Sequence, residues 1–153
     1  MPEYFEVALI SGKTGKSKEA MRNCLIEKFG LSEGKGTTKH FAGKNILVCF
    51  YEFEGTDFDE TEVNFPDQVF HKDDFEKELE DFTSFVNICF ESCNEVKFAV
   101  CSYELNGYLM SYTKKIEDFD DELLRKFPIV YKRETGQKHP LLMINLDAQG
   151  ILI

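Results

Sequence analysis

Asn94-Glu-Val-Lys-Phe-Ala-Val-Cys-Ser-Tyr-Glu-Leu-Asn-Gly-Tyr-Leu-Met-Ser-Tyr-Thr-Lys-Lys-Ile116 is the stretch that decides the fold, because a turn signal divides two runs of strand-forming residues. The two central residues of a type I′ turn need a positive φ angle, which Asn106 and Gly107 adopt readily. The stretch therefore predicts a β-hairpin whose two-residue loop sets the register. The expected cross-strand pairs are Leu105 with Tyr108, Tyr103 with Met110, and Cys101 with Tyr112.

The apolar side chains of this hairpin alternate along each strand, so the register also predicts which face is buried. Ala99 and the six paired residues share one face, which we expect to join the core. The opposite face begins apolar at Val96, Phe98 and Val100 and becomes polar at Ser102. We therefore expect this part of the sheet to be covered on one side and half-covered on the other.

Two further segments have the periodicity of amphipathic helices. Residues 17–29 begin with Ser17, a good N-cap residue, and carry apolar side chains on one side. Residues 72–92 show the clearest helical pattern, with the large apolar residues inside about 120° of arc. These residues are Phe75, Leu79, Phe82, Val86, Cys89, Phe90 and Cys93. A third, short helix is expected over residues 118–127, before Pro128.

Apolar runs predict further strands at residues 4–10, 45–53, 129–132 and 141–146, and a turn leads into 151–153. Residues 54–70 lack periodicity, and we expect them to form an irregular loop. The order of elements predicts one domain over residues 1–153, of α+β or mixed α/β class. We expect a mostly antiparallel, mixed sheet of five to seven strands, packed by two or three helices. The β-α-β start allows one parallel pair through a right-handed crossover.

The composition narrows the class of protein. A chain of 153 residues with 42% hydrophobic content and 15 Phe can bury a core of its own. No apolar run approaches the roughly 20 residues that span a bilayer, and the N-terminus lacks the features of a signal peptide. Five cysteines without disulfide-framework spacing indicate a reduced, cytoplasmic protein.

The net charge of −10 is concentrated in the middle of the chain. Residues 51–122 hold 21 Asp and Glu against five Lys and Arg, whereas the flanking segments are each net positive. Nucleic acid is a poor ligand for such a surface, because binding its phosphates requires Lys and Arg. A cationic protein is a better partner.

The densest part of this acidic block runs from Glu52 to Pro66 and mixes carboxylates with phenylalanines. Carboxylates steer a cationic partner, and aromatic side chains provide buried anchors at an interface. The predicted partner-binding residues are Glu52, Glu54, Asp57, Phe58, Asp59, Glu60 and Glu62, with the charged positions exposed. The other interpretation is a solvated loop whose phenylalanines enter the core. The interface would then lie on the acidic faces of helices 72–91 and 118–127.

The segment Gly12-Lys-Thr-Gly-Lys-Ser17 lies between a predicted strand and a predicted helix, where a phosphate-binding loop would lie. The Walker pattern requires a glycine at the position that Ile10 occupies, so the match is incomplete. We interpret the segment as a turn followed by an N-cap. Gly15, Lys16 and Ser17 remain the alternative phosphate site.

Other motifs predict no chemistry. Cys89 and Cys93 are one helical turn apart on an apolar stripe, and no second pair of metal-ligand spacing accompanies them. The three histidines lie near no nucleophile motif. Residues 57–68 lack the central Gly and final Glu of a calcium loop. The sequence therefore predicts no metal, no cofactor and no enzymatic activity.

These patterns together favour a small acidic binding protein that inhibits a basic partner, as an immunity protein does. A nuclease or another nucleic-acid-acting toxin is a natural partner, since its substrate groove is cationic. The alternatives are an enzyme or ligand-binding domain that uses the 12–17 loop for a phosphate, and a scaffold whose acidic surface only maintains solubility. The sequence leaves open whether the chain is a monomer or a homodimer.

Overall fold

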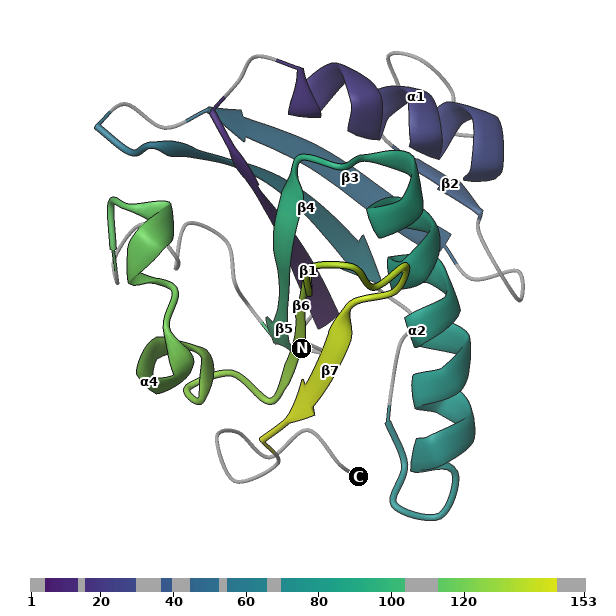
Figure 1. The fold of residues 1–153 in the computed structure, drawn as a ribbon. Coiled ribbons are helices and arrows are strands. Elements are labelled where there is room, and N and C mark those ends of the chain that lie inside the picture. The colour runs from purple at the N-terminus through teal and green to yellow at the C-terminus, as the bar shows by residue number, and fades with distance from the viewer. Residues whose placement is uncertain are drawn as a thin grey trace.

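The computed structural model describes residues 5–13, 16–29, 37–39, 45–52, 55–65, 70–103 and 113–145. Within these residues, seven strands form one sheet in the order β2-β3-β4-β1-β5-β6-β7 (Figure 1). The strands are β1 (Phe5–Gly12), β2 (Thr37–Lys39), β3 (Asn45–Glu52), β4 (Phe58–Phe65), β5 (Val96–Tyr103), β6 (Ile129–Lys132) and β7 (Leu141–Ile144). With its helices, this antiparallel sheet confirms the predicted α+β class.

Strand β1 is the centre of the sheet. It pairs with β4 on one edge and with β5 on the other, and both neighbours run antiparallel to it. Its first seven residues are all buried, as expected for an interior strand covered on both faces. The parallel pair that the β-α-β start allowed does not form, because β4 inserts between β1 and β3.

Helices α1 (Ser17–Phe29) and α2 (Phe75–Ser92) cover one face of the sheet (Figure 1). Their apolar sides pack on the odd-numbered residues of β1, such as Val7 and Leu9, and form the larger core. The predicted stripe of α2 is confirmed: Leu79, Phe82, Val86, Cys89 and Phe90 are buried, and Phe85 joins them. The helix begins three residues later than predicted, because residues 72–74 form a turn.

The opposite face carries a smaller layer made of the 3₁₀ helix η2 (Ile116–Asp118) and the single-turn helix α4 (Asp121–Leu124). Asp120 caps α4 by accepting a hydrogen bond from the Leu123 amide at 3.0 Å. Leu124 and Phe127 pack on Ala8 of β1 in a second core. The face expected to be half-covered is therefore covered here, and the predicted helix 118–127 is divided and shorter.

The hairpin predicted for β5 is wrong for the residues that the structure describes. Cys101 lies between Val7 of β1 and Ile129 of β6, so no edge remains for Tyr112 to pair with it. Residues 113–115 contain a bend at Lys114 and lead into η2, where a strand was expected. The Asn106-Gly107 turn itself lies outside the described residues. The predicted burial of Ala99 and Cys101 is confirmed.

The C-terminal strands agree with the sequence over their described part. Strand β6 has the predicted bounds, and β7 extends the sheet at its edge from residue 141 to 144. The expected final strand at 151–153 lies outside the described residues. None of the helices in the described part of the chain is long and apolar enough to cross a membrane.

Candidate functional site

The acidic stretch that sequence reasoning assigned to an exposed loop is largely a strand inside the sheet. Strand β4 runs from Phe58 to Phe65 between β3 and β1. Glu60 and Glu62 are each 1% exposed, and Asp59 is also buried. The predicted exposure of these three residues is wrong, because strand pairing on both edges and cover on both faces remove them from solvent.

The remaining predicted partner-binding residues either have structural roles or have side chains that the structure does not describe. The buried Phe58 packs edge-on against Phe119, with ring centroids 5.3 Å apart, so it is a core residue. Asp57 is exposed, but its Oδ1 accepts a hydrogen bond from the Ile116 amide at 2.6 Å and ties this turn to η2. The side chains of Glu52 and Glu54 lie outside the described part.

The buried carboxyl groups of β4 form a cluster with Glu6 of β1. Glu6, Glu60 and Glu62 occupy the sheet face that also carries Ala8, because Glu62 is directly opposite that residue. Burial, and then the nearby Glu6 carboxylate, raise the pKa of Glu60 to about 7. The same causes, with Glu60 as a further negative neighbour, raise the pKa of Glu62.

Asn64 lies beside this cluster. With its amide nitrogen turned toward the carboxyl groups, it donates to Glu62 Oε1 at 3.2 Å and to Glu6 Oε1 at 3.1 Å. Neither oxygen of Glu60 has a hydrogen-bond partner among the described residues. The cluster therefore retains protons near neutral pH, so it contributes less negative charge than the sequence suggests.

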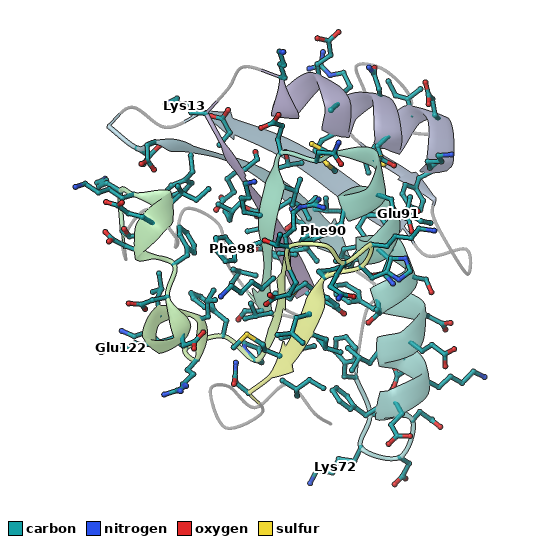
Figure 2. All side chains as sticks on the ribbon, viewed as in Figure 1. Lys13, Lys72, Phe90, Glu91, Phe98 and Glu122 are labelled. Atoms are coloured by element: carbon teal, nitrogen blue, oxygen red, sulfur yellow. The ribbon has the colours of Figure 1, made fainter. Side chains whose placement is uncertain are left out.

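The exposed carboxylates lie elsewhere, and one group surrounds a hollow of about 710 Å³ at the start of α2. It is lined by Lys72, Asp73, Asp74, Phe75, Glu76, Lys77 and Glu80, and we call it the acidic hollow. Figure 2 shows Lys72 beside the N-terminal end of α2 and Glu91 at its C-terminal end. The hollow is lined by four carboxylates and two ammonium groups. Its excess of negative charge favours a cationic ligand.

Local contacts hold the shape of this helix start. Glu78 reaches back to His71, accepting from its backbone amide at 2.9 Å and contacting its Nδ1 at 3.2 Å. The amide of Glu78 in turn donates to the carbonyl of Asp74 at 3.0 Å. The ring of Phe75, which lines the hollow, lies 5.6 Å from that of Phe70, between ring centroids. The acidic rim therefore includes one aromatic side chain that is packed against the core.

Three carboxylates of the rim have no competing contact within the part of the chain that the structure describes. No hydrogen bond or ion pair within the described residues occupies the side chains of Asp73, Glu76 or Glu80, and all three are exposed. The sequence analysis reached this surface only as an alternative, by placing a second possible interface on the acidic face of helix 72–91. The sequence signal that could have located the hollow is the acidic run at the start of this helix, preceded by a turn.

A second acidic surface lies on the other layer. Glu117, Asp118, Asp120, Asp121 and Glu122 are all exposed around η2 and α4. Figure 2 shows Glu122 on the opposite side of the molecule from α2. Three of these side chains are engaged: Asp120 caps α4, Asp118 Oδ2 accepts from the Thr113 hydroxyl at 3.0 Å, and Glu117 Oε1 lies 3.9 Å from Lys115 Nζ. This surface therefore offers a partner fewer carboxylates without contacts among the described residues than the acidic hollow does.

The alternative phosphate loop is described only in part. Strand β1 extends two residues beyond its predicted end, to Gly12, whereas α1 covers the predicted residues 17–29. Gly15 lies outside the described residues. Lys16 is exposed, and Lys13 donates from Nζ to the Thr56 carbonyl at 3.3 Å. The strands that flank β1 are antiparallel to it, unlike the parallel strands of doubly wound nucleotide-binding sheets.

The cysteines and histidines form no metal site within the described residues. Cys24, Cys89, Cys93 and Cys101 are buried free thiols. His71 contacts Glu78, and His139 Nε2 lies 2.6 Å from Glu91 Oε1 on the surface. The contact with His139 is the main cause of the lowered pKa of Glu91.

Comparison of the chain with protein-family models, with curated proteins and with solved structures found no match.

Proposed function

We propose that this chain is a protein-binding domain that inhibits a cationic partner, and that the acidic hollow is its docking surface. The observation that carries the proposal is the hollow itself, which is lined by exposed carboxylates together with the ring of Phe75. Carboxylates attract a basic partner from a distance, and an apolar side chain beside them can provide a desolvated anchor at an interface.

The chemistry of the hollow favours a Lys or Arg side chain presented by a protein as its ligand. A long basic side chain can place its charged end among Asp73, Glu76 and Glu80 while its methylene groups cover Phe75. Lys72 and Lys77 on the same rim would repel a uniformly basic surface. They therefore favour a partner whose basic residues lie beside acidic or neutral residues. Recognition of this kind needs no chemistry from the chain itself.

A nuclease or similar toxin is the partner class that this proposal favours, because its substrate groove is a cationic patch that an acidic protein can cover. Inhibition then follows from occupying the groove. The absence of disulfide bonds among the described cysteines supports a reducing, cytoplasmic setting for such an inhibitor.

The proposal is tested by removing charge from the hollow and comparing the result with equal charge removal elsewhere. The test variant is Asp73→Asn, Glu76→Gln and Glu80→Gln, and the control variant is Glu117→Gln, Asp121→Asn and Glu122→Gln. Both lose three exposed carboxylates without a large change in volume. Wild type and both variants are used as bait in extracts of the native host and against the product of an adjacent gene.

We expect a basic protein to be retained by wild type and by the control variant but lost by the hollow variant. Its association rate constant should fall on the order of tenfold in the hollow variant and lose its salt dependence, because steering charges act mainly on association. Phe75→Ala should instead increase the dissociation rate. Equal losses in the two triple variants would show that only net charge matters and would contradict this site.

A further inference from the structure

Strand β4 has two different faces, and the proposed binding function uses neither of them. Toward α1 and α2, the strand contributes Val63 and Phe65 to the larger core. On the other face, the side chains along the middle of the strand are those of Glu60, Glu62 and Asn64. The middle of β4 is therefore packed by apolar side chains on one face and by polar groups on the other.

The carboxyl groups of this polar face lie on both sides of the seam between β1 and β4. Glu6 of β1 is paired with Asn64, and Glu62 is the next residue on the same face of β4. With its amide nitrogen turned toward them, Asn64 donates to Glu6 at 3.1 Å and to Glu62 at 3.2 Å. Glu60 occupies the following position of that face, opposite Ile10. Negative charge on these groups therefore acts across the contact between the two strands.

The two glutamates of β4 lack most of the contacts that a buried carboxylate needs. Both side chains are 1% exposed. Both oxygens of Glu60 and the Oε2 atom of Glu62 have no hydrogen-bond partner among the described residues. No positively charged side chain in the described ranges acts on either group. A carboxylate buried in this way is costly, and the group accepts a proton instead.

The elements around these two glutamates bring no basic residue to them in the part of the chain that the structure describes. From β3, the residues paired with the two glutamates are Cys49 and Tyr51. From β5, the residue paired with Glu6 is the buried Ser102. The charged residues of η2 and α4 are acidic and exposed. The basic residues next to these helices and after β1 are exposed as well: Lys13, Lys114, Lys115, Arg125 and Lys126.

We propose that Glu6, Glu60 and Glu62 form a proton-dependent latch between β1 and β4. While the latch retains its protons, β4 stays paired with β1 and holds the outer strands β3 and β2 in the sheet. When the protons are lost, buried charges on both sides of the seam repel one another, and β4 opens more often together with these outer strands. Burial and the nearby Glu6 carboxylate raise the pKa of Glu60 to about 7, so the change occurs near neutral pH.

Hydrogen–deuterium exchange of the full chain tests the latch. Exchange is measured at about pH 5.5 and at about pH 8, and the intrinsic exchange rate at each pH is divided by the measured rate to give a protection factor. The protection factors of residues 59–65 in β4 should be about tenfold or more lower at the higher pH, because one unit of pKa shift changes an equilibrium constant tenfold. At that pH they should also lie below those of residues 129–132 in β6, because β4 opens without the rest of the sheet.

The wild-type measurement alone can overturn the proposal, so the test does not depend on whether a substituted core folds. Protection of β4 that is the same at both pH values would show that no latch exists. Equal protection factors for β4 and β6 at the higher pH would show that the chain opens only as a whole.

Two double variants assign the effect to the buried carboxyl groups. Glu60→Gln with Glu62→Gln keeps the size of both side chains and removes their charge, so β4 should have the same protection at the two pH values. Glu117→Gln with Glu122→Gln removes two exposed carboxylates and should follow wild type. If the first variant loses protection in β4 as wild type does, the charge on these glutamates is not the cause, and the proposal is wrong.

Discussion

Arg133 donates from Nη2 to the carbonyl of Phe90 at 2.8 Å, and its guanidinium carbon lies 5.0 Å above the ring of that same residue. The side chain also donates to the carbonyl of Val96 at 2.6 Å and to that of Cys93 at 3.0 Å. Helix α2 has no basic residue in its own last turn. An arginine that follows β6 therefore satisfies the carbonyls and the negative end of this helix.

Replacing Arg133 with Ala should lower the free energy of unfolding by about 2–3 kcal/mol, because three hydrogen bonds from a charged donor are lost. Arg133→Lys should recover only part of this, since an ammonium group lacks the planar fork and stacks less well. Urea unfolding midpoints provide the measurement, with the exposed Arg125→Ala as control. Equal midpoints for Arg133→Ala and Arg125→Ala would show that Arg133 does not stabilise the end of α2.

Glu60 should make the stability of this protein decrease as pH rises. Its carboxyl group has an ordinary pKa of 4.5 when unfolded and about 7 when folded. Below 4.5 both states are protonated, so no penalty exists. Between 4.5 and about 7 the folded state retains a proton that the unfolded state has released, and folding becomes less favourable. Above about 7 the loss is complete, at roughly 3 kcal/mol.

Glu60→Gln should therefore match wild type near pH 4.5 and exceed it in stability near pH 8, because a neutral amide carries no such penalty. Urea midpoints at the two pH values measure the difference. Glu122→Gln removes an exposed carboxylate and should follow the wild-type pH profile. If Glu60→Gln also follows that profile, the Glu60 carboxyl group is not protonated in the folded state.

Phe82→Ala should lower the free energy of unfolding by about 3–5 kcal/mol, the usual range for a fully buried phenylalanine. Phe82 has no exposed surface, and its ring meets Phe5 at 5.3 Å and Phe65 at 5.2 Å between centroids. Ser84 lies on the exposed side of the same helix, where its hydroxyl donates to the Glu80 carbonyl at 3.1 Å, so Ser84→Ala should change the free energy of unfolding little. Similar denaturation midpoints for the two variants would contradict this assignment of the helix faces.

Inorganic phosphate and ATP should leave the melting temperature unchanged, in wild type and in Lys16→Ala alike. The loop before α1 departs from the Walker pattern, and β1 has antiparallel neighbours. Differential scanning fluorimetry at increasing ligand concentration is sufficient. A stabilisation by phosphate that disappears in Lys16→Ala would instead favour the ligand-binding alternative.

The helices of the larger core could be predicted because their information is local. The spacing of Leu79, Phe82 and Val86 places them on one side of any helix, whatever that helix packs against. The same holds for Met21 and Leu25 in α1. Strand β6 could also be bounded from sequence, because an apolar run ends there between turn-forming residues.

Strand pairing could not be predicted from the sequence, because the residues of one strand do not determine which other strands lie beside it. The apolar alternation around Cys101 correctly predicts a buried face, but any strand with a matching pattern can occupy its edges. In the folded chain those edges belong to β1 and β6, which are distant in sequence. Only the tertiary structure could decide between them and the local hairpin partner.

The same reason explains the misplaced acidic site. Sequence alone determines that residues 51–122 are strongly acidic, and carboxylates are exposed in most proteins. The tertiary structure buries Glu60 and Glu62 by placing β4 inside the sheet, and it leaves Asp73, Glu76 and Glu80 in solvent around a hollow. Charge is a property of composition, but its exposure depends on which distant segments cover each side chain, because burial is a contact between parts of the chain.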